Sequence, residues 1–212
     1  MKISARRPTI VDMADIIVVH GTPGAGKSTH SKNLAEHHLK DRPVFHISVG
    51  DRLRAIRTGE FQSKYGAEIN DPNAPALLDH RLVNGVIFEY ISLCSPDSVV
   101  LVDGYPRFAD ATEPFVEAVN EDDHKLLGCV HLEISQETSI NRLAGRGVRR
   151  GERIGDITPG VAERRYDEHQ TYTLEAIREL SEAAPVVKID AELSEREVWT
   201  SFYNVVRDLA SK

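Results

Sequence analysis

The sequence has 212 residues, of which 28% are charged and 41% are hydrophobic, and its formal net charge is −7. This length accommodates one large core, and no apolar run approaches the length needed to cross a bilayer, so we expect a single domain that is not embedded in a membrane. The negative charge opposes broad binding to nucleic acid, so an anionic ligand must be held by local positive charge.

The N-terminal residues and the cysteines bear on location in the cell. Residues 1–14 include basic side chains but no apolar stretch of signal-peptide length, so we expect a loose leader. Cys94 and Cys129 are far apart and lack the spacing of paired metal ligands, which is typical of reduced thiols that pack in a core. We therefore predict a cytoplasmic protein, and we expect it to be a monomer.

A glycine-rich loop follows the first predicted strand, and residues 21–28 fit the pattern G-x-x-x-x-G-K-[S/T]. Gly24 and Gly26 can adopt backbone angles that other residues avoid, so that successive N–H groups turn inward toward the positive end of the next helix. In such a loop Lys27 reaches the β- and γ-phosphates of a nucleotide, and the Ser28 hydroxyl binds a magnesium ion. The residues assigned to this phosphate-binding loop are Gly21, Pro23, Gly24, Ala25, Gly26, Lys27, Ser28 and Thr29.

Along the rest of the chain, apolar runs of strand length alternate with segments of helical period. This alternation predicts crossover connections and a five-stranded parallel sheet with helices on both faces. The predicted strands are residues 16–20, 44–48, 99–102, 129–133 and 186–189, and the predicted helices are residues 27–39, 51–58, 80–94, 136–144, 160–183 and 194–210. The last helix begins with the capping-box pair Ser194 and Glu197.

Two stretches interrupt this alternation. Residues 58–78 contain two glycines and two prolines, and residues 145–159 are rich in glycine and arginine. We expect both to be mobile insertions in the single domain.

The ends of the second and third strands carry charged side chains. Ligands of an open parallel sheet lie beyond the carboxyl ends of its strands, so Arg54 shares an edge with the phosphate-binding loop. Asp103 ends an apolar strand, where an acidic residue is suited to organise magnesium and its waters. Gly104 follows it and shapes a turn that presents Arg107.

An arginine series begins at the helix after the fourth strand. Arg142 and Arg146 are four residues apart and share one helix face, Arg153 lies in the second insertion, and Arg164 lies near the start of the next helix. A nucleic-acid patch is opposed by the acidic total, whereas the interleaved glycines favour a flap that closes. Phosphoryl transfer requires such a clamp of charges with water excluded, and the planar guanidinium suits it.

These ordered motifs resemble the adenylate kinase and nucleoside monophosphate kinase family, from about residue 15 to the C-terminus. The matching motifs are GTPGAGKST at 21–29, ISVGDRLR at 47–54, DGYPR at 103–107, NRLAGRG at 141–147 and GERIGD at 151–156. The resemblance implies a P-loop NTPase-type three-layer α/β/α domain over residues 15–212. Its core comprises residues 15–56, 83–145 and 160–212, with a helical acceptor-binding insertion at 57–82 and a short lid at 146–159.

The resemblance also implies roles for individual residues. Lys27 and the loop amides hold the phosphates of ATP, Arg142 stacks on its base, and Ser28 and Asp103 hold Mg²⁺, the latter through water. The implied catalytic residues are Lys27, Arg107, Arg146, Arg153 and Arg164. The implied acceptor-binding residues are Val49, Arg54, Gly104, Arg107, Arg153 and Arg164.

The departures from the family pattern lie mostly where the acceptor base is read. Val49 and Ala111 stand where adenylate kinases usually have Thr and Gln. Neither side chain can hydrogen-bond to a base edge, so the sequence leaves the acceptor base open.

We therefore predict an enzyme that transfers the γ-phosphoryl group of ATP to a nucleoside monophosphate with Mg²⁺, giving ADP and a nucleoside diphosphate. Its partners are small nucleotides, with neither nucleic acid nor a membrane. Two alternatives stay open: a phosphate-loop kinase of another small molecule, and a non-catalytic nucleotide sensor.

Overall fold

A computed structural model describes residues 13–40, 42–73, 78–150 and 160–211, with the backbone alone for residues 146–150. The described residues form a five-stranded parallel sheet in the order β2-β3-β1-β4-β5, which confirms the predicted α/β architecture. The strands are β1 (Asp15–Gly21), β2 (Val44–Ser48), β3 (Val99–Asp103), β4 (Lys125–Glu133) and β5 (Val186–Asp190).

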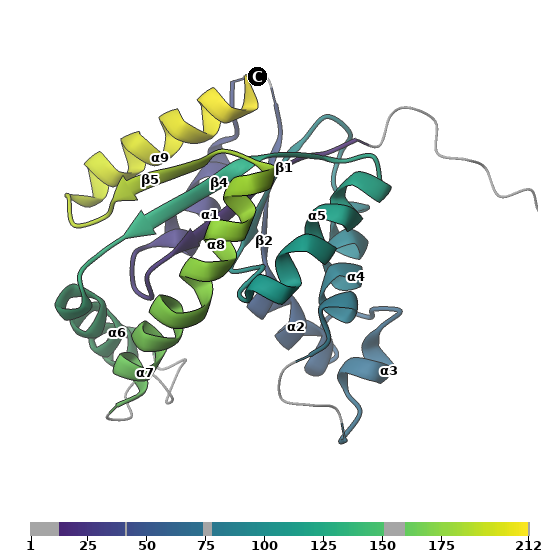
Figure 1. Cartoon of the computed structure of the whole chain (residues 1–212), viewed down its shortest axis with the longest axis horizontal. Coiled ribbons are helices and arrows are strands. Elements are labelled where there is room, and N and C mark those ends of the chain that lie inside the picture. The colour runs from purple at the N-terminus through teal and green to yellow at the C-terminus, as the bar shows by residue number, and fades with distance from the viewer. Residues whose placement is uncertain (1–12, 41, 74–77, 151–159, 212) are drawn as a thin grey trace, which may run out of the picture.

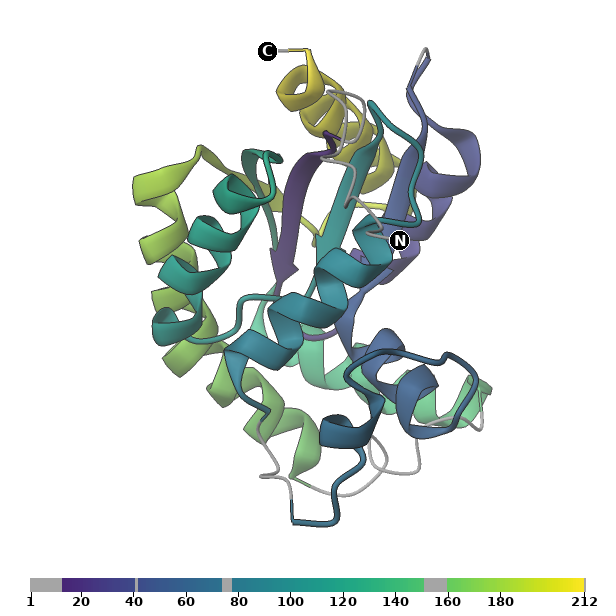
Figure 2. The ribbon, with the colours of Figure 1, turned by 90° about the vertical axis from the view of Figure 1, so that its right-hand side faces the viewer.

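The helices lie on both faces of this sheet, as Figures 1 and 2 show. They are α1 (Lys27–His37), α2 (Val49–Arg57), α3 (Gly66–Ile69), α4 (His80–Ile91), α5 (Thr112–Glu121), α6 (Gln136–Arg150), α7 (Val161–Glu168), α8 (Leu174–Ala183) and α9 (Glu195–Ala210). A 3₁₀ turn, η1 (Ala109–Ala111), precedes α5, and a π-helical turn, η3 (His169–Thr173), joins α7 to α8.

Two apolar layers hold the sheet because the side chains of each strand alternate between its faces. On one face, residues of β1 such as Ile17 pack with residues of α1 and α9 such as Leu34 and Phe202. On the other face, Ile16 packs with residues of α4 and α5 such as Ile87 and Phe115. The central strands β1, β3 and most of β4 are thus buried on both sides, as expected of a parallel sheet, whereas the edge strands β2 and β5 are partly exposed.

The parallel pairing brings chain segments that are distant in sequence to one edge of the sheet. Val19 of β1 and Ser48 of β2 both lie opposite Asp103 in the register of their neighbouring strands. α2 follows β2 directly, and α6 begins soon after β4, so both helices start at this carboxyl edge. In Figure 1 they extend below the sheet on opposite sides.

Several boundaries differ from the predicted ones. Residues 112–121 form α5, a helix that was not predicted; its Pro114 lies in the first turn, where proline forfeits no helical hydrogen bond. α6 continues past residue 144 to Arg150, so the first residues of the predicted second insertion are helical. The predicted helix over 160–183 is interrupted by η3.

Both cysteines are free thiols, and Cys129 is buried. Burial raises the pKa of Cys129 to about 12 and that of Cys94 to about 11, so both stay protonated and unreactive at neutral pH. Within the described part of the chain, no helix is both long and apolar enough to cross a membrane.

The capping box predicted at the start of α9 is confirmed. The Glu197 backbone N–H donates to Ser194 Oγ at 3.4 Å, and Glu197 Oε2 accepts from the Ser194 backbone N–H at 3.1 Å. Two N–H groups at the helix start are therefore satisfied by side chains.

Ser194→Ala should lower the free energy of unfolding by about 1 kcal/mol, because the acceptor for the Glu197 N–H is lost. Urea unfolding monitored by circular dichroism measures this change. Ser181→Ala is the matched control, because Ser181 is exposed inside α8 and its hydroxyl contacts only a carbonyl of its own helix. An equal effect of the two substitutions would contradict the capping role.

Candidate functional site

The phosphate-binding loop is held from the side of α6. Ser139 Oγ donates to the Pro23 carbonyl at 2.6 Å, and Thr22 Oγ1 accepts from the Ile134 N–H at 3.3 Å. Gly24 has a φ of 87°, and a Cβ there would lie 3.3 Å from the Ser139 carbonyl oxygen. The loop therefore requires glycine both for its backbone angle and for its close approach to α6.

Lys27 is the first residue of α1, and its side chain folds back over the loop. Its Nζ donates to the Gly21 carbonyl at 2.6 Å and to the Thr22 carbonyl at 3.2 Å. Gly26, with a φ of 93°, precedes the helix and provides no side-chain cap. The start of α1 thus combines backbone N–H groups, the positive end of the helix and an ammonium group, the arrangement that binds phosphate.

Asp103 joins the loop to the neighbouring strands. Its Oδ2 accepts a hydrogen bond from Ser28 Oγ at 2.5 Å and lies 3.2 Å from His46 Nε2, and the residue is 5% exposed. Burial favours the neutral acid, but the His46 hydrogen bond and the Lys27 charge outweigh it and lower the pKa of Asp103. The carboxylate is therefore ionised at neutral pH.

Magnesium fits this pair of oxygen ligands. No group of three or more His, Cys, Asp or Glu side chains among the described residues is arranged to hold a metal. Mg²⁺, however, commonly takes one or two protein oxygens and completes its shell with water and phosphate. Ser28 and Asp103 supply such oxygens beside the phosphate-binding loop.

His46 is a contact of Asp103 that the sequence analysis missed. It lies on β2 within an apolar run, where it has the appearance of a packing residue. The signal was its position two residues before the end of a strand that pairs with β3.

The predicted acceptor residues fall into two groups. Arg54 is half exposed and forms an ion pair with Asp51 on the same helix, and Arg107 Nε donates to the Gly104 carbonyl at 3.1 Å. Gly104 has a φ of 84°, which suits the turn that carries Arg107. The side chains of Val49 and Ala111 are both buried in the core, so neither presents a surface to a ligand.

The predicted arginine clamp is described in part. The Arg142 Nη2 donates to the Ala191 carbonyl at 3.1 Å, and its Cβ lies beside Gly24. Arg164 is exposed on α7, with its Nε 3.7 Å from Glu168 Oε1. Arg146 belongs to α6, where the backbone alone is described, and Arg153 lies outside the described residues. The structure thus brings Lys27, Ser28, Asp103 and Arg142 to the loop, whereas the gathering of the other arginines stays a prediction.

Three buried histidines near the carboxyl edge were also missed. His20 of β1 pairs in register with His131 of β4, and the His131 and His169 rings are stacked with centroids 5.5 Å apart. Burial is the main reason that all three pKa values are lowered, to about 4 for His131 and about 3 for His169. All three rings are therefore neutral at pH 7. We call them the histidine cluster.

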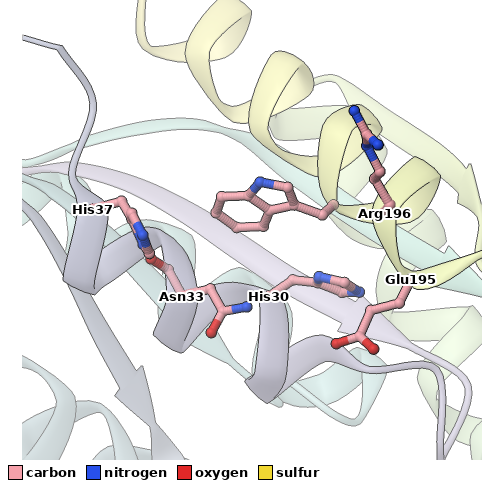
Figure 3. Close-up of a pocket in the computed structure, with 6 residues that line it drawn as sticks. His30, Asn33, His37, Glu195 and Arg196 are labelled. Atoms are coloured by element: carbon pink, nitrogen blue, oxygen red, sulfur yellow. The ribbon is translucent and has the colours of Figure 1, made fainter.

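Two hollows of the described surface are lined by other residues than those of the phosphate-binding loop. One, of about 460 Å³, lies between α1 and α9 and is lined by His30, Asn33, His37, Glu195, Arg196 and Trp199 (Figure 3). The other, of about 960 Å³, lies between α4 and α5. Neither is lined by Lys27, Asp103 or Arg142, so the candidate site is defined by its phosphate-binding groups rather than by either hollow.

Comparison with known proteins agrees with this geometry. The family model described as adenylate kinase matches residues 19–192, so the chain belongs to the adenylate kinase family, a family of nucleotide-binding kinases.

Its relatives carry the same name. The adenylate kinase of Oenococcus oeni is 27% identical over 93% of this chain and all of that protein, and that of Nitrobacter hamburgensis is 25% identical over 91% of this chain and 92% of that protein. The adenylate kinase of Staphylococcus epidermidis is 31% identical over 62% of this chain, and the match spans only 59% of that protein.

The neutral histidine cluster should make stability depend on pH. A histidine whose pKa is about 6.5 in the unfolded chain but lower in the folded one reduces the free energy of unfolding by about 1.4 kcal/mol for each pH unit below 6.5. The contribution is zero above pH 6.5, and stability is lost as the pH falls from there toward 4. Urea unfolding at several pH values measures this trend, and an unfolding free energy that is constant down to about pH 5 would contradict it.

Proposed function

We propose that this protein transfers the γ-phosphoryl group of ATP to a nucleoside monophosphate, giving ADP and a nucleoside diphosphate. The observation that carries the proposal is the junction of Lys27, Ser28 and Asp103 at the phosphate-binding loop. Membership of the adenylate kinase family supports it. The relatives named above match different extents of the chain at 25–31% identity, so the acceptor is part of the proposal and not of the family assignment.

In this mechanism the protein positions two nucleotides and neutralises the charge that moves between them. Lys27 and the loop amides bind the ATP phosphates, and Arg142 stacks on the adenine. Magnesium, when bound by Ser28 and through water by Asp103, supplies positive charge to the phosphate oxygens. No general base is required, because a phosphate acceptor is already ionised near neutral pH.

The acceptor and the closure of the site involve the remaining predicted residues. Arg54 and Arg107 hold the acceptor phosphate, and Gly104 and the backbone of Val49 at the start of α2 complete this part of the site. Residues 57–82 form the acceptor-binding insertion, and residues 146–159 form a short lid whose closure excludes water. Arg146, Arg153 and Arg164 then contact the group in transfer. The monomeric state and the cytoplasmic location belong to the same proposal.

A kinase of a different small acceptor is the second candidate. The buried, apolar side chains of Val49 and Ala111 favour it, because they provide no hydrogen bond that would select a base.

An acceptor panel tests the proposal. ADP release from ATP and Mg²⁺ is measured with AMP, CMP, UMP, GMP, the deoxynucleoside monophosphates and non-nucleotide acceptors. We expect at least one nucleoside monophosphate to accelerate ADP release and to appear as its diphosphate. Acceleration by a non-nucleotide alone would identify the second candidate. Tight binding of a two-substrate analogue without transfer would identify a nucleotide sensor.

Lys27→Ala should lower kcat by about 10²- to 10³-fold, because a preorganised cation at the transferring group is removed. The circular dichroism spectrum should stay unchanged, since Lys27 lies at the start of α1 and not in the core. Lys125→Ala is the matched control, because Lys125 is exposed at the start of β4, and the candidate site lies at the other, carboxyl end of the strands. Wild-type turnover of the Lys27 variant would exclude this residue from the mechanism.

A further inference from the structure

The histidine cluster is a buried polar group that the proposed mechanism does not use. His20 is 2% exposed, His131 1% and His169 6%, and they come from three different elements: β1, β4 and η3. Five of their ring nitrogens have no hydrogen-bond partner among the described residues: His20 Nε2, and Nδ1 and Nε2 of both His131 and His169. A proton added to His169 would create a buried charge without a hydrogen-bond acceptor, whereas His131 Nδ1 lies 3.3 Å from Glu133 Oε1.

The charges that face the cluster are mostly positive. They are Lys27 from the phosphate-binding loop, Arg107 from the turn after β3, Lys188 from β5, and the carboxylate Glu133 from β4. Glu133 Oε1 lies 3.3 Å from His131 Nδ1, but it also lies 2.9 Å from Lys188 Nζ, which takes up much of its charge. α8 adds the apolar residues Ala176, Ile177 and Leu180 on the same face of the sheet. The surroundings therefore favour neutral rings.

η3 connects this cluster to α7, the helix that carries Arg164 of the candidate site. It is a π-helical turn, a feature that often occurs at functional positions. His169 stacks on His131 of the sheet, and Tyr172 of the same turn packs against Phe108, the neighbour of Arg107, at 5.4 Å. α7, which carries Arg164, ends where η3 begins, and α7 lies beside α6 (Figure 1).

We propose that the His131–His169 stack is a positioning contact, which seats η3 on the sheet and orients α7 toward Lys27 only while both rings are uncharged. Protonation of either ring adds a charge among Lys27, Arg107 and Lys188, and the η3 turn then separates from β4. His131 and His169 are thus positioning residues that act through Arg164 and not on the substrate. The consequence for catalysis rests on the proposed function, whereas the contact itself does not.

The separation should precede global unfolding in acid. Separation gives each ring access to protons, and its pKa then returns to the unfolded value of about 6.5. At about pH 5, protonation of one such ring favours the open form by about 30-fold. Only η3 and its flanking helices have to move, whereas β1 and β4 are buried between two layers.

Hydrogen exchange of the full-length protein tests the contact without any assay of activity. Protection factors are compared at about pH 7.5 and about pH 5, after correction for intrinsic exchange rates. In the wild type, amides of residues 164–178 should lose protection by about 30-fold or more, whereas those of β1 and α9 lose less. His169→Phe keeps the ring stack and removes one of the two titrating rings, so the loss in residues 164–178 should be smaller than in the wild type by up to about 30-fold.

Two further variants make the test specific. Lys188→Gln removes a cation that faces His131 and frees Glu133, so the closed form tolerates a protonated His131 better and the loss of protection should begin at lower pH than in the wild type. His37→Phe changes an exposed histidine on α1 and should leave the pH at which protection is lost unchanged. If His169→Phe fails to fold, the Lys188→Gln shift alone decides the question.

The proposal is overturned if residues 164–178 keep their protection at about pH 5 in the wild type. It is also overturned if His169→Phe loses protection as the wild type does, or if Lys188→Gln leaves the pH of the transition in place. Where the acceptor panel has established turnover, kcat should fall in acid more steeply for the wild type than for His169→Phe, with the ATP KM changed less. A failed panel with the expected exchange results would refute the function and leave the contact standing.

Discussion

The candidate site depends on the parallel pairing of β1 with β3. That pairing sets Val19 opposite Asp103, so the phosphate-binding loop begins beside the one buried carboxylate at the end of β3. The Ser28 hydroxyl then reaches Asp103 Oδ2 at 2.5 Å from the first turn of α1. A shift of this register by one residue would turn Asp103 to the other face of the sheet and remove it from Ser28, because side chains alternate along a strand.

The chain is acidic overall, yet most of the charged groups described at the phosphate-binding loop are cationic or are positive helix ends. The net charge is −7, whereas the start of α1, Lys27 and Arg142 lie at the loop. Local charge and not the total therefore decides what binds, since exposed charges beyond about 10 Å are screened at physiological salt. Asp103 is the exception among these groups, and its Ser28 and His46 contacts keep it ionised where a cation can use it.

The sequence contained enough information for the fold and for the loop, because both depend on local signals. Apolar runs of strand length gave the five strands, and the glycine–lysine pattern gave the loop. The helix α5 was not predicted because its apolar stripe is short and Pro114 resembles a break in the helical pattern. Two contacts were not predicted for a different reason, that of Asp103 with His46 and that of His131 with His169. Each joins residues that are distant in sequence, and an isolated histidine in a strand has the appearance of a packing residue. Which long-range neighbours meet is set by the sheet order and register, which a single sequence does not encode locally.

The phosphate-binding cations and the histidine cluster are coupled through the same charges. Lys27 and Arg107 lower the affinity of His20 and His169 for protons. An anionic nucleotide at the loop offsets those two charges, so it must raise that affinity, and by linkage a proton on the cluster must favour nucleotide binding by the same factor. Under the two proposals taken together, acid therefore has opposite effects on nucleotide binding and on phosphoryl transfer. It favours phosphate binding at the loop, and it releases α7, which carries Arg164. The Lys27 ammonium group takes part both in phosphate binding and in keeping the histidine rings neutral. A protein with separate cations for these two roles would lack the coupling between nucleotide binding and protonation.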